Sequence, residues 1–273
     1  MLPGMARRAR NQTPGLIRHI MSRGNGRMRI FRDDDDYRQF VYVLGEAVER
    51  YDVACWNYCL MPNHYHLTLV PSRSNLSEAI RRVNSVYAQW WNRRHRRVGH
   101  VFQGRFKDQI VQREGYLLSL SRYVVGNPVR ARLAARPEDW PWSSYRATAG
   151  LIPCPAFLDV KPTLSQFGEE EETVLRARFS RYVREEREDK SANDRLRSGE
   201  RVLGTRAFKA SLEGRIESNA GDKDMSASRV LDSAPDAPAL VNLRQGLSAA
   251  TPDAAEPLPR SAIPGSDPGL TLA

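Results

Sequence analysis

Two histidines separated by one residue, His64 and His66, are of the right type and spacing to bind a metal ion. The run 63–70 around them alternates apolar and polar residues, which predicts a β-strand. Side chains alternate across a strand, so both histidines face away from Tyr65, which points into the core. Two imidazoles at positions i and i+2 lie close enough to chelate one ion. The same spacing also fits a pair of solvated or hydrogen-bonding histidines, and the pattern alone leaves both interpretations open.

A tyrosine and an asparagine four residues apart, Tyr123 and Asn127, share one face of the helix predicted for residues 114–127. A phenol can act as a covalent nucleophile, and an amide oxygen can complete a metal site. Alternatively, Tyr123 packs in the core and Asn127 only caps the helix, which Pro128 ends. Tyr116 lies seven residues upstream on a similar face and is a rival nucleophile.

The elements that position these residues alternate between strands and helices. Alternating apolar residues bounded by turn signals predict strands at 16–21, 53–60, 64–70 and 101–111. Apolar residues at helical spacing predict helices at 33–50, 75–97 and 114–127. The order β-α-β-β-α-β-α predicts an α+β class, ferredoxin-like or RRM-like, with an antiparallel sheet. Its helices cover one face of the sheet, and the other face is free for a site.

The sequence divides into four predicted segments. They are a basic N-terminal arm (1–13), the mixed domain (14–150), a helical extension (151–217) that includes a helix at 169–190, and a Pro/Ala/Ser-rich tail (218–273). The tail has no apolar period, so it cannot offset the entropy cost of ordering, and we expect it to be disordered. Whether the extension docks on the mixed domain or helps to bind a partner stays open.

Positive charge is concentrated in the first 150 residues, which hold 25 Lys and Arg against 12 Asp and Glu. The whole chain carries +10, so the charge balance favours a polyanionic partner such as nucleic acid. Basic side chains neutralise phosphates and make binding depend on salt, although runs of charge are often only solvated surface. The candidate DNA contacts are Arg23, Arg27, Arg93, Arg94, Arg96, Arg97, Arg105 and Lys107, of which Arg105 and Lys107 are expected on one face of the fourth strand.

Several classes of protein are excluded by composition. A hydrophobic fraction of 41% excludes wholesale disorder, and no apolar run is long enough for a membrane span. The N-terminus lacks the apolar segment of a signal peptide. Three cysteines without zinc-ligand spacing suit a reducing, cytoplasmic compartment, and Cys55 and Cys59 are expected as buried thiols on one face of the second strand.

Four segments occur in a characteristic order between residues 14 and 150: MPNHYH (61–66), GHVFQGRFK (99–107), RY followed by NPVRA (122–131), and WPWSSY (140–145). Together they resemble the REP-associated tyrosine transposases, a branch of the HUH single-strand DNA endonucleases. LGTRAF (203–208) also resembles a C-terminal element of some members. The tail does not match the basic ending of the family.

The resemblance implies a role for each candidate residue. His64 and His66 correspond to the metal-binding pair, Tyr123 to the nucleophile, and Asn127 to the third ligand, which is Gln in the related insertion-sequence transposases. The implied cofactor is Mg²⁺ or Mn²⁺. The implied reaction leaves a 3′-hydroxyl and a 5′-phosphotyrosine link, so the same enzyme rejoins strands without ATP. The implied substrate is a single-stranded, palindromic REP-type hairpin, bound by a nucleoid-associated monomer or homodimer.

Two other functions stay open. The first is a catalytically silent hairpin-binding regulator, although a binding protein needs none of the four residues His64, His66, Tyr123 and Asn127. The second is an autonomous insertion-sequence transposase. Asn rather than Gln at position 127, together with the WPWSSY segment, favours the REP-associated branch.

Overall fold

The computed structural model describes residues 13–185, 194–196 and 200–212. The predicted basic arm, except its last residue, and the predicted disordered tail lie outside this part of the chain. The strands are β1 (Ile17–Arg23), β2 (Val53–Met61), β3 (His64–Pro71), β4 (Lys107–Val111) and β5 (Val202–Leu203). The longer helices are α1 (Asp34–Tyr51), α2 (Leu76–Arg94), α3 (Leu117–Val125) and α7 (Glu172–Arg184). The short ones are η1 (Asn25–Arg27), α4 (Asn127–Arg130), η2 (Pro137–Asp139), α5 (Tyr145–Thr148), α6 (Lys161–Leu164) and η3 (Ser165–Phe167). None of the helices in this part is long and apolar enough to cross a membrane.

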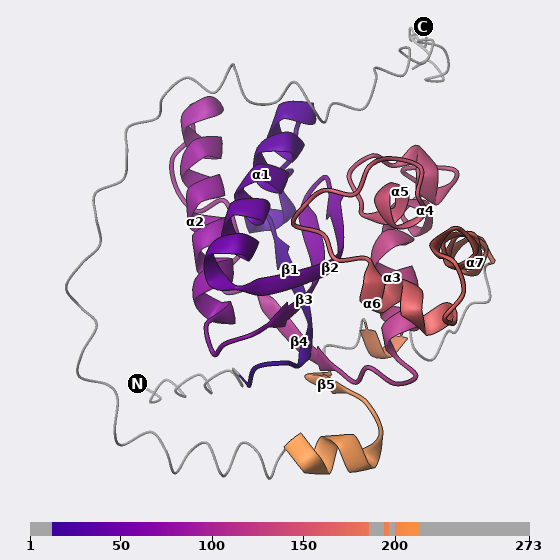
Figure 1. Cartoon of the computed structure of the whole chain (residues 1–273). Helices are drawn as coiled ribbons and strands as arrows, with labels where there is room; N and C mark the ends of the chain where they lie inside the picture. Colours follow the sequence, from indigo (N-terminus) through magenta and orange to yellow (C-terminus); the bar gives the residue numbers. More distant parts are fainter. Residues whose placement is uncertain (1–12, 186–193, 197–199, 213–273) are drawn as a thin grey trace, which may run out of the picture. The chain divides into compact units, whose positions relative to one another are not determined.

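The five strands form one sheet in the order β2-β3-β1-β4-β5 (Figure 1). The first four are antiparallel to their neighbours, and β5 runs parallel to β4. The predicted α+β class with an antiparallel sheet is therefore confirmed. The fifth strand was not predicted, and it comes from the segment that the sequence assigned to a helical extension.

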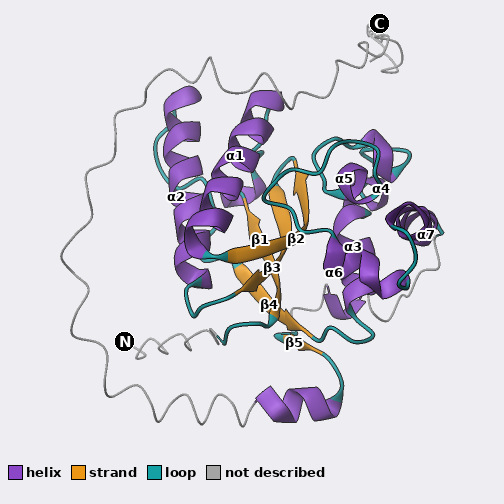
Figure 2. Ribbon diagram, viewed as in Figure 1, coloured by secondary structure: helices purple, strands orange, loops and turns teal. Residues whose placement is uncertain are grey.

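Helices lie on both faces of the sheet (Figure 2). On one face, α1 and α2 pack over Ile20, Tyr65 and Leu67 in the main hydrophobic cluster. On the other face, α3 packs against the sheet in a second cluster that includes Leu120 and Val124. The prediction of a free second face is therefore wrong, because α3 is apolar enough to need burial of its own. Any site on that face lies beneath α3.

A β-bulge in β2 changes the face of the sheet to which the side chains after it point. The pairing of β2 with β3 shifts register between Cys55 and Asn57. One extra residue reverses the alternation of side chains, so Cys55 joins the main cluster and Cys59 joins the cluster beneath α3. Both thiols are buried as predicted, but the expectation that they share a face is wrong.

Three predicted boundaries also move. The fourth strand begins at Lys107 rather than 101, because Gly104, inside the predicted strand, takes a positive φ angle (62°) that interrupts extended backbone. Helix α2 ends at Arg94 rather than 97. Helix α3 ends at Val125, and the chain restarts as α4, so Asn127 lies at the beginning of a new turn rather than within α3.

The chain beyond residue 150 shares the core. Leu175, Phe179 and Val183 of α7 lie in the main hydrophobic cluster, and Leu203 of β5 lies in the cluster beneath α3. The helix expected at 169–190 is observed at Glu172–Arg184, and residues 186–190 lie outside the described part. The extension therefore docks on the mixed domain, a point that the sequence left open.

Candidate active site

Three histidines from two neighbouring strands converge beneath α3. β1 pairs with β3 so that His19 lies opposite Thr68 and Met21 lies opposite His66, which places all four side chains on one face. The ring centroids of His19 and His66 are 5.1 Å apart and stacked, and those of His64 and His66 are 5.1 Å apart and nearly perpendicular. His19 and His66 are only 5% and 2% exposed, whereas His64 is half-buried.

A chain of hydrogen bonds fixes the proton positions on this cluster. The side-chain nitrogen of Gln109 donates to the main-chain oxygens of Glu200 (2.7 Å) and Arg195 (3.3 Å). The amide oxygen therefore faces His19 and accepts from its Nδ1 at 3.3 Å. Nε2 of His19, left without a proton, accepts from Nδ1 of His66 at 2.9 Å. It follows that Nε2 of His66 carries a lone pair and no proton.

Burial keeps all three imidazoles neutral. Loss of solvation lowers the pKa of His19 to about 4, against a partial rise from its hydrogen bond to Gln109. Loss of solvation, with the positive charge of Arg23, lowers the pKa of His64 to about 4. The pKa of His66 lies well below its usual value for the same reason, reinforced by its histidine neighbours and by the charges of Arg130 and Arg23. Neutral imidazole is the form that binds metals.

Helix α3 places Tyr123 directly against the histidines. Its ring centroid lies 5.6 Å from that of His66 and 5.7 Å from that of His19, with both contacts edge-to-face. The guanidinium of Arg130 lies 4.6 Å from the centre of the Tyr123 ring and donates to the Tyr123 main-chain oxygen. Tyr116 is the residue before α3, and it is partly buried against the hydrophobic cluster beneath α3. Among the described residues, Tyr123 is the tyrosine whose ring contacts these histidines.

Asn127 takes the capping position that the sequence left as an alternative. Its side-chain nitrogen donates to the main-chain oxygens of Tyr123 (2.9 Å) and Val124 (3.3 Å) at the end of α3. The amide oxygen is the atom of this side chain that remains for a ligand. The cap ties Asn127 to the same turn of helix that carries Tyr123.

The donor atoms of the histidine pair fit a divalent cation. Nδ1 of His64 donates to the Asn63 side-chain oxygen at 2.6 Å, and Nδ1 of His66 donates to His19, so Nε2 of each ring is left as a ligand atom. Within the described ranges, no group of three His, Cys, Asp or Glu side chains is arranged to hold a metal ion. The histidine pair therefore presents two ring nitrogens with free lone pairs.

The predicted DNA-contacting residues are distributed over different surfaces. Arg23 is the last residue of β1 and lies opposite His64. Lys107 pairs with Met21, so its side chain is on the same sheet face as the histidines. Arg105 precedes β4 and lies beside α2, so the expectation that Arg105 and Lys107 share a strand face is wrong.

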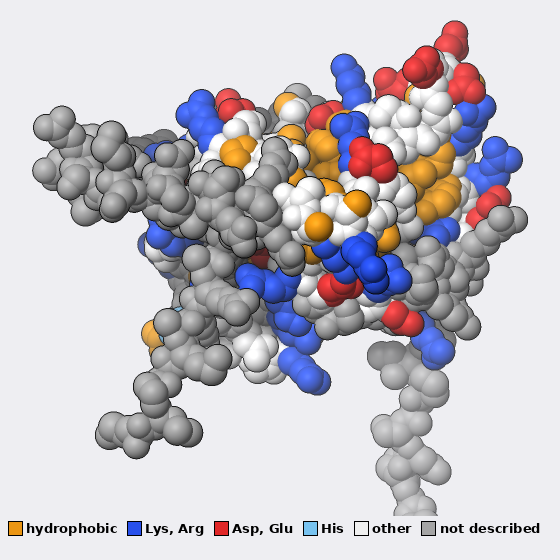
Figure 3. All heavy atoms as spheres, turned by 90° about the horizontal axis from the view of Figure 1, so that it is seen from below, with side chains coloured by type: hydrophobic (Ala, Val, Ile, Leu, Met, Phe, Trp, Pro, Cys, Tyr) orange, Lys and Arg blue, Asp and Glu red, His pale blue; other side chains and the backbone are white. Residues whose placement is uncertain are grey.

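The other candidate arginines differ in their partners. Arg94 forms ion pairs with Asp33 (2.6 Å), Asp35 (3.2 Å) and buried Asp36 (2.7 Å). Four exposed candidates form no such ion pair with any described residue: Arg27, Arg93, Arg96 and Arg97. Basic side chains in one view of the surface lie at several separate places rather than in one patch (Figure 3).

Sequence reasoning missed the roles of His19 and Arg130. His19 is recognisable only once β1 is placed beside β3, which brings it opposite Thr68. Arg130 lies seven residues after Tyr123, two helical turns away, so its spacing carried a signal that was not used.

Comparisons with known proteins found one family model and several solved structures similar to the chain. Residues 12–127 match the family model described as IS200-like transposase. No curated protein sequence matches the chain. One similar solved structure is a REP-associated tyrosine transposase bound to a REP hairpin, with 17% identity and a TM-score of 0.47 over 57% of this chain and 93% of that one.

Proposed function

We propose that this chain, whose residues 12–127 match the IS200-like transposases, is a metal-dependent single-strand DNA endonuclease and strand transferase. One observation carries the proposal. The Tyr123 ring contacts the buried His66 ring edge-to-face, so a nucleophile lies beside one of the two neutral imidazoles proposed to bind the metal ion. A protein that only binds DNA gains nothing from burying such groups together.

The residues of the chain have distinct roles in this reaction. Nε2 of His64, Nε2 of His66 and the Asn127 amide oxygen would hold a divalent cation, Mg²⁺ or Mn²⁺. The cation supplies Lewis-acid polarisation of the scissile phosphate. The Tyr123 oxygen forms a bond to phosphorus, and the bond between phosphorus and the 3′ oxygen breaks. The phenol loses its proton, and the leaving 3′ oxygen takes up one proton to become a hydroxyl. Arg130 holds the Tyr123 ring through its face and its main-chain oxygen.

The energy of the broken bond is retained in the 5′-phosphotyrosine link. Attack of a 3′-hydroxyl on this link reverses the first step, restores the phenol and joins two strands without ATP. The proposed substrate is a single-stranded REP-type hairpin, cut beside its foot. The unpaired DNA there leaves the phosphate accessible to a tyrosine on a rigid helix.

The test is incubation with single-stranded oligonucleotides that span palindromes beside the gene, with Mg²⁺ or Mn²⁺, followed by a denaturing gel. We expect a covalent protein–DNA band that EDTA and Tyr123→Phe both abolish, while the matched control Tyr116→Phe retains it. Tight hairpin binding without cleavage under either metal overturns the proposal in favour of a regulatory binding protein.

A further inference from the structure

Asn63, the residue before β3, joins the His64 ring to the loop that follows β1. Its side-chain oxygen accepts from Nδ1 of His64 at 2.6 Å, and its side-chain nitrogen donates to the main-chain oxygen of Arg27 at 3.2 Å. The NH₂ group has to face the Arg27 carbonyl, so the orientation of the amide is fixed and its oxygen faces His64. Nδ1 of His64 therefore keeps the proton, and Nε2 keeps the lone pair.

The loop at residues 24–28 presents the Arg27 oxygen at a defined place. Arg27 N donates to Gly24 O at 2.9 Å, and Arg27 itself has a φ angle of 61°, which residues other than glycine rarely adopt. A Cβ atom at Gly24 would lie 2.2 Å from the Met28 main-chain oxygen, so this close turn requires glycine. The loop is therefore compact, and its surroundings hold Arg27 in a strained conformation.

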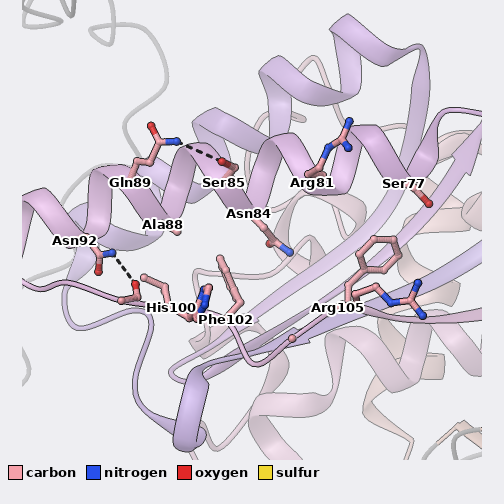
Figure 4. Close-up of a pocket in the computed structure, with 14 residues that line it drawn as sticks. Ser77, Arg81, Asn84, Ser85, Ala88, Gln89, Asn92, His100, Phe102 and Arg105 are labelled. Atoms are coloured by element: carbon pink, nitrogen blue, oxygen red, sulfur yellow. Dashed lines mark hydrogen bonds between the residues drawn. The ribbon is translucent and has the colours of Figure 1, made fainter. Parts of the chain in front are cut away.

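The segment 99–106 supports this loop from another side. Asn25 N donates to Val101 O at 2.8 Å. Figure 4 shows the same segment beside α2, where it lines a pocket of about 550 Å³ and where the Asn92 side chain donates to Gly99 O at 2.9 Å. The carbonyl that orients Asn63 is thus supported, through two layers of hydrogen bonds, by a long helix.

His64 depends on Asn63 more than His66 depends on any neighbour within reach of solvent. His66 is almost fully buried and hydrogen-bonded to His19, whereas His64 is half-buried. Within the described part of the chain, the side chain that is hydrogen-bonded to the His64 ring is Asn63. A neutral imidazole in water without such a partner favours the tautomer with its proton on Nε2, which blocks the nitrogen that would bind the cation.

We propose that Asn63 is a positioning residue of the metal site, which keeps Nε2 of His64 free of a proton and fixes the direction of its lone pair. The inference rests on the proposed function, in which His64 and His66 are ligands. Asn63 acts through the His64 ring and is not itself a ligand. Its two hydrogen bonds make the metal site depend on the loop that carries Arg27.

Two substitutions separate this role from a purely structural one. Asn63→Asp keeps an oxygen for Nδ1 of His64 but loses the donor to Arg27, whereas Asn63→Ala loses both groups. In a Mn²⁺ titration followed by electron paramagnetic resonance, we expect Asn63→Ala to weaken binding about tenfold to a hundredfold. Asn63→Asp is expected to bind Mn²⁺ at least as tightly as the wild type, because a carboxylate also accepts from Nδ1.

The matched control is Asn75→Ala. Asn75 follows the other end of β3, and its side chain likewise donates to a main-chain oxygen, that of Tyr51, at 2.8 Å. This variant is expected to bind Mn²⁺ as the wild type does. Thermal melting checks that each variant is folded under the conditions of the titration.

A second readout needs no metal. Nitrogen chemical shifts of labelled His64 in the metal-free protein are expected to place the proton on Nδ1 in the wild type and in Asn63→Asp, and to move it toward Nε2 in Asn63→Ala. A wild-type proton on Nε2, or equal losses of Mn²⁺ affinity in the two Asn63 variants, overturns the inference. If Asn63→Ala does not fold, the shifts of the wild type and of Asn63→Asp decide.

The outcomes for this inference and for the proposed function are distinct. A covalent Tyr123 adduct in the wild type, together with unchanged Mn²⁺ affinity in folded Asn63→Ala, removes this inference alone. A wild-type chain that carries the His64 proton on Nδ1 but binds no Mn²⁺ and forms no adduct removes the proposed activity instead.

Discussion

The two faces of the sheet present opposite kinds of chemistry. Beneath α3, His19 and His66 are almost fully buried and neutral, and their hydrogen bonds are fixed. Beside α2, Arg81 and Arg105 are exposed and charged. One strand serves both faces, because His66 points to the first and Tyr65 to the second. Under the proposed function, metal binding and nucleophilic attack depend on desolvation, whereas DNA recognition depends on access.

The buried face also depends on the extension. Gln109 holds His19 only because main-chain oxygens of residues 195 and 200 fix its amide. β5, from the same region, pairs with β4, which carries Gln109. A partly satisfied polar network in a core is costly, so the extension stabilises the arrangement of the histidines as well as the fold.

The largest expected effect is that of His66→Ala on cleavage, and it distinguishes the roles of the two sheet faces. His66→Ala removes one metal-binding nitrogen and is expected to lower cleavage by about a thousandfold or more, since the cation site loses one of its two nitrogens. Binding of hairpin DNA, measured by fluorescence anisotropy in EDTA, is expected to stay within about twofold, because the exposed arginines are unchanged. An equal loss of DNA binding would show that the two faces are not independent.

Acid is expected to destabilise the buried face. The folded-state pKa of His19 is about 4 and its usual value is 6.5, so the unfolded chain binds more protons between these limits. Stability is therefore fully present above pH 6.5 and falls as the pH drops toward 4, by about 3 kcal/mol from His19 alone. Urea unfolding at several pH values measures this loss. His19→Gln is expected to flatten the profile, and an unchanged slope in that variant contradicts the assignment.

The hydrogen-bond relay predicts a smaller, specific effect. Gln109→Leu removes the acceptor for His19 and is expected to weaken Mn²⁺ binding about tenfold to a hundredfold, because the protons on His66 are no longer fixed. Nitrogen chemical shifts of labelled His66 report its tautomer, which a merely structural role of Gln109 would leave unchanged. Wild-type shifts that place the proton on Nε2 of His66 would refute the relay.

The smallest effect distinguishes the arginines near the end of α2. Arg94→Ala leaves Asp36 buried with fewer partners and is expected to cost about 1–3 kcal/mol of stability, with little effect on DNA affinity. Arg93→Ala, its exposed neighbour, is expected to leave the melting temperature unchanged. A drop in DNA affinity for Arg94→Ala at a temperature where it is folded would reassign Arg94 to DNA binding.

Local patterns predicted much of this architecture. The alternation of apolar and polar residues predicted strand β3 and the sheet face to which His66 points. The helical spacing of apolar residues predicted helix α3, which carries Tyr123. Long-range relations were not predictable in the same way. β5 pairs with a strand about 90 residues earlier, and the bulge after Cys55 depends on packing across the sheet. His19 became part of the site only through the order of strands, which local residue spacing does not encode.

The most direct measurement locates the covalent link. After reaction with hairpin oligonucleotide and nuclease trimming, trypsin places Tyr116 in peptide 114–122 and Tyr123 in peptide 123–130, so mass spectrometry separates the two candidates. We predict a nucleotide phosphate on peptide 123–130 only. The same mass on peptide 114–122, or cleaved DNA with neither peptide modified, would contradict the assignment of Tyr123 as the nucleophile.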